Sequence, residues 1–74
     1  MKLKYLIIKH SGLEAPLIFA PILRHEIVAG NSNVQSAGFC NCDETGKWTV
    51  SGESVSLKLS ARPEDAEILN TLLA

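Results

Sequence analysis

Hydrophobic and polar positions alternate in three short runs between residues 34 and 59, and turns that contain glycine separate these runs. The runs cover residues 34–42, 47–50 and 54–59, with turns at 43–46 and 51–53. Successive side chains of a strand point to opposite faces, so alternation is typical of strands with one buried face. The pattern predicts a three-stranded antiparallel meander joined by tight turns.

The third run, residues 54–59, alternates most sharply. Its apolar residues, Val55, Leu57 and Leu59, are expected to point into the core, and its polar residues toward water. In the first run, Gly38 weakens the strand and marks either a bulge or the close approach of another segment.

Two further strands are predicted before this meander. Residues 3–9 are partly apolar on both alternating faces, which indicates a central strand or one covered on both sides. A turn at 10–12 leads to a second apolar run at 14–19. Pro16 has no backbone N–H, so this run is expected to lie at a sheet edge or to begin at Pro16.

Residues 21–29 fit two different structures. Pro21 suits the first position of a helix, and a glycine directly follows the segment, as at many helix ends. Ile22, Leu23 and Ile27 recur at helical spacing, which predicts a short helix with these side chains toward the core. A strand over the same residues is the alternative.

The C-terminal residues from 63 onward predict an amphipathic helix. Pro63 suits its first position, and acidic residues follow near the positive end of the helix dipole. Its apolar residues recur at spacings of three and four: Ala66, Ile68, Leu69, Leu72 and Leu73. We expect this face to pack on the sheet, and any leucine left uncovered to contact a second subunit.

Together these elements predict a single α+β domain over residues 1–74. Its core would be one antiparallel sheet of about five strands, with a short helix after the first hairpin and the C-terminal helix on one face. A single core in a chain below about 70–80 residues rarely supplies more than about 3–5 kcal/mol. Because two cysteines are too few for a disulfide framework, a homodimer is the expected source of additional stability.

Charge and hydropathy narrow the classes of partner. The net charge is −1 at pH 7, and the basic residues are not clustered. Binding to nucleic-acid phosphates requires clustered lysine and arginine, so a nucleic acid is not the expected partner. No apolar run has the length of a signal-peptide core or of a membrane span. We therefore expect a cytoplasmic protein with reduced thiols.

Cys40 and Cys42 form the sharpest candidate site. Positions i and i+2 of a strand share a face, so the two thiolates could hold one zinc ion, with His10 and His25 as further ligands. However, structural zinc sites usually have two to four residues between paired cysteines. Two small side chains packing in the core explain the pair more simply, and no metal or other cofactor is expected.

No catalytic residue is predicted. Neither His10 nor His25 is accompanied by a nucleophile elbow or an oxyanion loop, and both are expected at the surface. The lone tryptophan, Trp48, is expected in the core or at its edge, with an interface anchor as the alternative. The candidate interface residues are Trp48, Leu69, Leu72 and Leu73.

Three strings between residues 36 and 69, SAGFC, SGESVSLKL and ARPEDAEIL, resemble those of short proteins encoded by bacteriophages and prophages of proteobacteria. The resemblance implies an accessory phage protein in the bacterial cytosol, and it transfers no activity and no functional residue. We predict a non-enzymatic interaction protein that acts on a host or phage partner. The alternative is a small metal- or nucleic-acid-binding regulator that uses Cys40 and Cys42.

Overall fold

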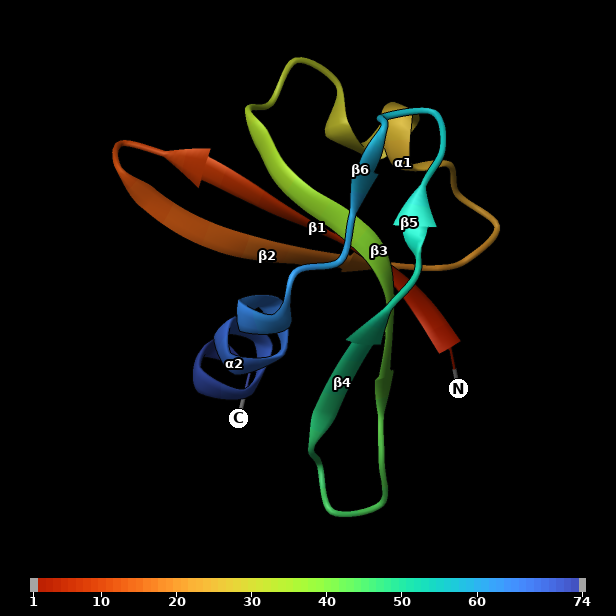
Figure 1. The fold of residues 1–74 in the computed structure, drawn as a ribbon, viewed down its shortest axis with the longest axis vertical. Coiled ribbons are helices and arrows are strands. Elements are labelled where there is room, and N and C mark those ends of the chain that lie inside the picture. Colours follow the sequence, from red (N-terminus) through yellow and green to blue (C-terminus); the bar gives the residue numbers. More distant parts are fainter. Residues whose placement is uncertain (1, 74) are drawn as a thin grey trace.

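The computed structural model describes residues 2–73, which fold into a four-stranded antiparallel sheet, a separate two-stranded ladder and two helices (Figure 1). The main sheet has the order β2-β1-β3-β4, with β1 (Lys2–His10), β2 (Leu13–Phe19), β3 (Val34–Cys42) and β4 (Trp48–Ser51). The other elements are β5 (Glu53–Ser54), β6 (Leu59–Ser60), α1 (His25–Ala29) and α2 (Pro63–Leu72). The predicted α+β class is confirmed, with the ladder β5–β6 standing apart from the main sheet.

The central strand is β1, as its apolar composition predicts. It pairs antiparallel with β2 on one side and with β3 on the other. Tyr5, Leu6 and Ile7 are all fully buried, so apolar side chains cover both faces of the strand. Tyr5 and Ile7 belong to a core cluster with Leu69 of α2, and Leu6 belongs to a second cluster with Ala29 of α1.

Two backbone positions follow from their residue types. Pro16 lies in β2, which is an edge strand, where a missing N–H is tolerated. Gly38 lies in β3 where the chain leaving β4 passes close above it. A Cβ at Gly38 would lie only 2.7 Å from the backbone oxygen of Ser51. Gly38 therefore marks a close approach between segments, one of the two alternatives that the sequence offers.

The prediction of a strand over residues 54–59 was wrong. The chain leaves β5 after Ser54, turns over residues 55–58 and returns as β6. Lys58 has a φ of 57° and donates its N–H to the carbonyl of Val55, which closes the turn. Leu57 packs against the core cluster on the α1 side, but Val55 is 80% exposed.

The side chain of Asn70 occupies part of the outer edge of the main sheet. Asn70 Oδ1 accepts the N–H of Trp48 at 2.7 Å, and Asn70 Nδ2 donates to the Trp48 carbonyl at 3.1 Å. Since β4 is the outer strand, the amide of Asn70 takes the place at this edge that a further strand would need. Residues 53–60 pair with one another instead.

The short helix predicted over residues 21–29 is present and ends at Ala29 as expected, but it is shorter than predicted, and the alternative strand does not form. The chain turns over residues 21–24, and α1 begins only at His25. The residues that face the core also differ from the prediction, since His25 and Ala29 are buried and Ile22 and Ile27 are exposed. Positions i, i+3 and i+4 of a helix share one face, and here they are His25, Val28 and Ala29, so Ile27 faces away from the core.

The C-terminal helix is confirmed. It begins at Pro63, ends at Leu72 and packs on the cluster that contains Tyr5 and Leu69. In Figure 1, α2 lies at one end of the molecule, and α1 with the β5–β6 ladder lies at the other. The sheet is therefore covered on both faces, α2 covering one and α1 with β5–β6 the other.

Candidate functional site

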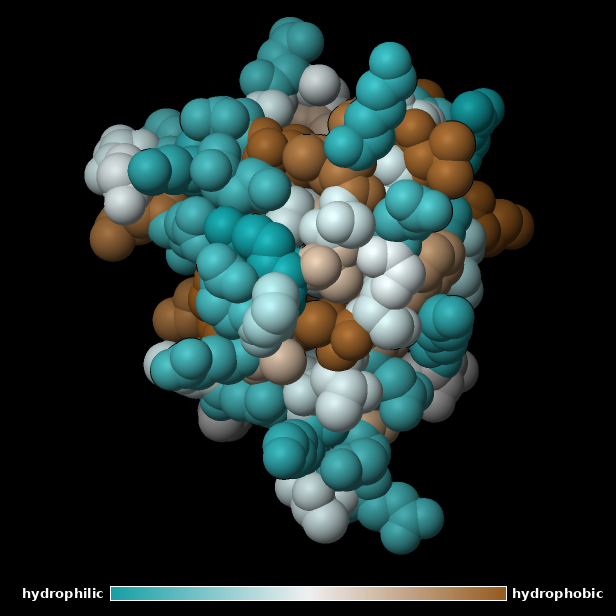
Figure 2. Space-filling model, in the orientation of Figure 1, coloured by the Kyte–Doolittle hydropathy of each residue, from teal (hydrophilic) through white to brown (hydrophobic). Residues whose placement is uncertain are grey.

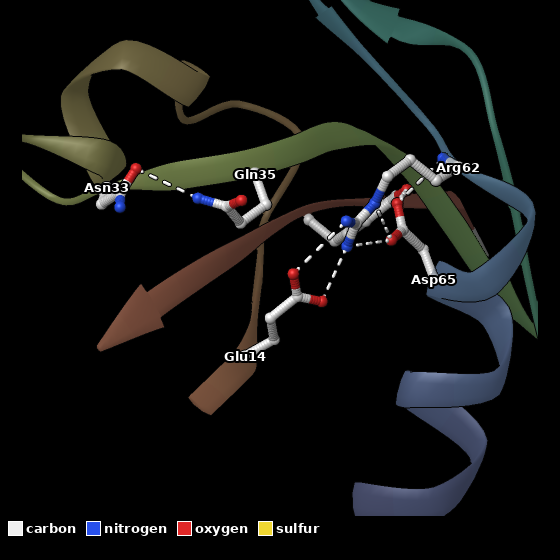
Figure 3. Close-up of polar contacts among 6 residues, drawn as sticks. Glu14, Asn33, Gln35, Arg62 and Asp65 are labelled. Carbon is white, nitrogen blue, oxygen red and sulfur yellow. Dashed lines mark hydrogen bonds and ion pairs between the residues drawn. The ribbon is translucent and has the colours of Figure 1, made fainter. Parts of the chain in front are cut away.

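A buried polar network fixes the start of α2 to the sheet (Figure 3). The carboxylate of Asp65 is fully buried and accepts a hydrogen bond from the Tyr5 hydroxyl at 2.5 Å. It also accepts from the backbone N–H and from Nε of Arg62, both at 2.9 Å. The same guanidinium donates to both carboxylate oxygens of Glu14 at 3.0 and 3.4 Å. The network thus joins β1, β2 and α2.

The electrostatics of this network favour an ionised Asp65 beside a protonated Tyr5. Burial alone would raise the pKa of Asp65, but hydrogen bonds from Tyr5 and Arg62, together with the nearby Ser36 hydroxyl, outweigh it and hold the pKa below its usual value. Burial and the hydrogen bond to Asp65 both raise the pKa of Tyr5. Ser36 Oγ is buried and makes no well-formed hydrogen bond with the described residues, although it lies near enough to Asp65 to affect its pKa.

A groove lies on the outer side of α2, next to this network. Its volume is about 310 Å³, and its lining residues are Glu14 of β2 and Glu64, Glu67, Ile68, Thr71 and Leu72 of α2. Ile68 is partly buried against the core and forms the apolar floor, while Leu72 is 56% exposed. The groove therefore combines an apolar base with three carboxylates.

A second exposed apolar surface lies at the opposite end of the molecule. It consists of Ile22, Leu23, Ile27 and Val55, and we call it the α1 surface. Ile22 is 87% and Ile27 is 69% exposed. The Ser56 hydroxyl donates to Glu26 of α1, which holds the 55–58 turn against the helix. Figure 2 shows apolar residues gathered at this end of one face of the molecule.

His25, which was expected at the surface, is buried. Its Nε2 lies 2.9 Å from the carbonyl oxygen of Gly38, and because a carbonyl only accepts, Nε2 must carry a proton. The ring also packs edge-to-face against Phe19 and Phe39, with centroid separations of 5.4 and 5.9 Å. His25 therefore anchors α1 to β3. His10 is exposed, as predicted.

An open depression of about 300 Å³ lies beside His25, and its lining includes Arg24, Glu26, Ser54 and Ser56. Arg24 Nε forms an ion pair with Glu26 at 2.5 Å. The hydrogen bond from Ser56 lowers the pKa of Glu26. These contacts engage Arg24 and Glu26 within the fold.

The residues of the candidate zinc site do not come together. Cys40 is buried in the core cluster beneath α2, and Cys42 is partly exposed. His25 is the first residue of α1 and contacts the carbonyl oxygen of Gly38, and His10 lies at the end of β1. Over residues 2–73, no three His, Cys, Asp or Glu side chains are placed to hold a metal ion. Burial and the neighbouring Cys42 raise the pKa of Cys40 to about 11, so its thiol stays protonated at neutral pH.

The candidate interface residues have different surroundings. Trp48 is partly buried and packs against the cluster beneath α2, in line with a place at the edge of the core. Leu69 is fully buried, so it cannot contact a second molecule, and this part of the prediction was wrong. Leu72 and Leu73 are exposed at the end of α2. The α1 surface was missed because its residues were assigned to the core.

Comparisons with protein-family models, with curated proteins and with solved structures gave no match. Between residues 2 and 73, no helix has both the length and the apolar character needed to cross a membrane.

Proposed function

We propose that this protein is a non-enzymatic interaction protein that forms a homodimer through the α1 surface. The observation that supports the proposal is the exposure of four large apolar side chains at one end of a small domain: Ile22, Leu23, Ile27 and Val55. Exposed large apolar side chains gathered at one end of a domain favour an interaction site, because leaving them in water is unfavourable.

The energetics favour a stable contact. Burying a Val, Leu or Ile side chain contributes about 1.5–3 kcal/mol. Three or four such side chains from each subunit exceed the lower estimates, about 4 kcal/mol, of the cost of association. A twofold axis through the α1 surface would place the same patch on both sides, as in most homodimers.

The proposal includes an accessory role in the bacterial cytoplasm, with a host or phage protein as a further partner. The resemblance of residues 36–69 to short phage and prophage proteins supports this origin. The use of His25 Nε2 as a structural donor to Gly38 supports a role without catalysis.

Analytical ultracentrifugation over a range of concentrations tests the homodimer. We expect the wild-type chain to dimerise and the Ile22→Ser/Ile27→Ser variant to be monomeric, because both side chains are exposed and their loss should not unfold the domain. Leu13→Ser is the matched control, since Leu13 is 75% exposed on β2, outside the α1 surface.

The control variant should dimerise like the wild type. A wild-type chain that remains monomeric at high micromolar concentration contradicts the proposal. A dimer that survives the double substitution but is lost in Leu72→Ser would move the interface to the end of α2.

A further inference from the structure

We propose that the groove beside α2 is a second docking site, which binds a segment of another protein in which arginine or lysine flanks an apolar side chain. This surface is distinct from the α1 surface and does not depend on dimerisation. The inference comes from the juxtaposition of an apolar floor with Glu64 and Glu67, two carboxylates that form no ion pair among the described residues.

One face of α2 provides most of the groove. Five lining residues lie at positions i, i+3, i+4, i+7 and i+8 of the helix: Glu64, Glu67, Ile68, Thr71 and Leu72. This spacing places them side by side along the helix. Ile68 and Leu72 can therefore contact one apolar side chain of a partner while the glutamates lie within reach of its neighbours.

The position of the groove is fixed by the polar network. Arg62, which directly precedes α2, donates to both carboxylate oxygens of Glu14 in β2 and also pairs with the buried Asp65. These contacts hold the helix wall and the strand wall at a constant separation. A preformed groove loses little conformational entropy when a partner binds, which favours affinity for a short segment.

The charges identify the partner. Glu64 and Glu67 have no ion-pair partner among the described residues, and α2 from Pro63 to Leu72 contains no basic residue. An acidic or phosphorylated segment would be repelled, and a purely apolar one would leave the carboxylates without partners. A segment with a cation beside an apolar side chain can pair with the carboxylates and also cover the apolar floor of the groove.

A second copy of this chain fits the groove poorly. Lys2, Lys4 and Lys9 lie within β1, which is paired on both sides in the sheet. Arg24 follows the exposed Leu23 but is already paired with Glu26. The leucines on either side of Lys58 pack against the core. A segment of a different protein therefore fits the groove better than a second copy does. The partner is recognised as an extended or helical peptide, which is how amphipathic segments occupy grooves.

Binding of a defined probe tests the inference. The probe is a capped, fluorescein-labelled peptide of arginine alternating with leucine, and its two controls replace every arginine by glutamate or every leucine by serine. We expect saturable binding of the probe below about 1 mM, weaker at higher salt, and at least tenfold weaker binding of either control peptide. Amide shifts in a ¹⁵N spectrum should concentrate at residues 64–72.

Matched variants separate the groove from general electrostatic attraction. Glu64→Gln/Glu67→Gln removes two carboxylates from the groove, and Glu44→Gln/Glu53→Gln removes two exposed carboxylates elsewhere. We expect the first pair to weaken binding of the probe about three- to tenfold and the second pair to have less than a twofold effect. Circular dichroism melting confirms that both variants are folded.

Absence of saturable binding, equal binding of the glutamate peptide, or equal weakening by the two variant pairs would each overturn the inference. The same titration on the Ile22→Ser/Ile27→Ser variant separates this site from the proposed homodimer. Binding there should be unchanged, whereas its loss would assign the peptide to the α1 surface.

Discussion

Replacement of Asp65 by asparagine should destabilise this protein more than any other conservative change at its helices. The carboxylate is fully buried and receives hydrogen bonds from the Tyr5 hydroxyl and from the backbone and guanidinium of Arg62. All of these partners are donors. An asparagine side chain offers one acceptor oxygen and places its own N–H₂ donors near the backbone N–H and guanidinium of Arg62, which can only donate.

The magnitude is large for a domain of this size. Removing one partner of a fully buried ion pair costs about 3–5 kcal/mol. Because Arg62 keeps its pairing with Glu14, we expect Asp65→Asn to cost an amount near the lower end, about 3 kcal/mol. At about 0.05–0.15 kcal/mol per residue, 74 residues correspond to a total stability of roughly 4–11 kcal/mol. Asp65→Asn should therefore remove about a quarter of the stability or more. Tyr5→Phe removes a single hydrogen bond to a charged group and should cost less, about 1.5–3 kcal/mol.

Urea unfolding, followed by the fluorescence of Trp48, measures these differences at pH 7 and at lower pH. The folded-state pKa of Asp65 is lowered, so its contribution is present above the ordinary carboxylate pKa of about 3.9 and is lost as the pH falls through the folded-state value. The gap between wild type and Asp65→Asn should therefore narrow in acid. Glu64→Gln, on the exposed side of the same helical turn, is the control and should stay within about 0.5 kcal/mol of wild type.

Two results would refute this reasoning. One is an Asp65→Asn variant as stable as the control. The other is a Tyr5→Phe variant that loses more stability than Asp65→Asn, which would place the main contribution in the packing of the tyrosine ring rather than in the carboxylate.

Three further predictions concern the strands around β3. Gly38→Ala should lower the unfolding free energy by about 1–3 kcal/mol in urea titrations, because its methyl group would lie 2.7 Å from the Ser51 carbonyl; an unchanged midpoint would contradict the close approach. With a thiol reagent at pH 8, Cys42 should react quickly and Cys40 only on unfolding, because burial raises the pKa of the Cys40 thiol to about 11. Variants with a single cysteine show which residue reacts in each phase. A rapid reaction of Cys40 in the folded protein would be inconsistent with its burial. Long-range ¹H–¹⁵N spectra should show a proton on Nε2 of His25, and a proton on Nδ1 alone would exclude the hydrogen bond to Gly38.

The parts of the fold that the sequence predicts are those in which local pattern and tertiary contact agree. The strand at β1 is apolar on both faces because it is central, and α2 combines a proline start with an apolar stripe. The run at 54–59 has equally clear alternation but forms a turn. The alternation of apolar and polar residues indicates which side chains would share a face of a strand. It does not indicate whether another strand has a free edge for pairing. Here Asn70 occupies the edge that would be needed.

The candidate surfaces depended on contacts that no local pattern encodes. The Asp65 network joins residues that are up to 60 positions apart, and an aspartate in a first helical turn ordinarily suggests only interaction with the helix dipole. In the same way, His25 next to Glu26 looks like part of a solvated helix. Its burial depends on Phe19, Phe39 and the carbonyl of Gly38, which the sheet brings together.

The burial of His25 also explains why the α1 surface exists. The inward side of the five-residue helix holds an imidazole, Val28 and the small side chain of Ala29. Ile27 therefore faces outward, and Ile22 is exposed in the turn that precedes the helix. Exposed isoleucines add nothing to the burial of apolar surface in a domain that has few fully buried apolar residues. Their exposure is explained if both isoleucines contribute to binding. The oligomeric state of the Ile22→Ser/Ile27→Ser variant is therefore the decisive measurement for the proposed function.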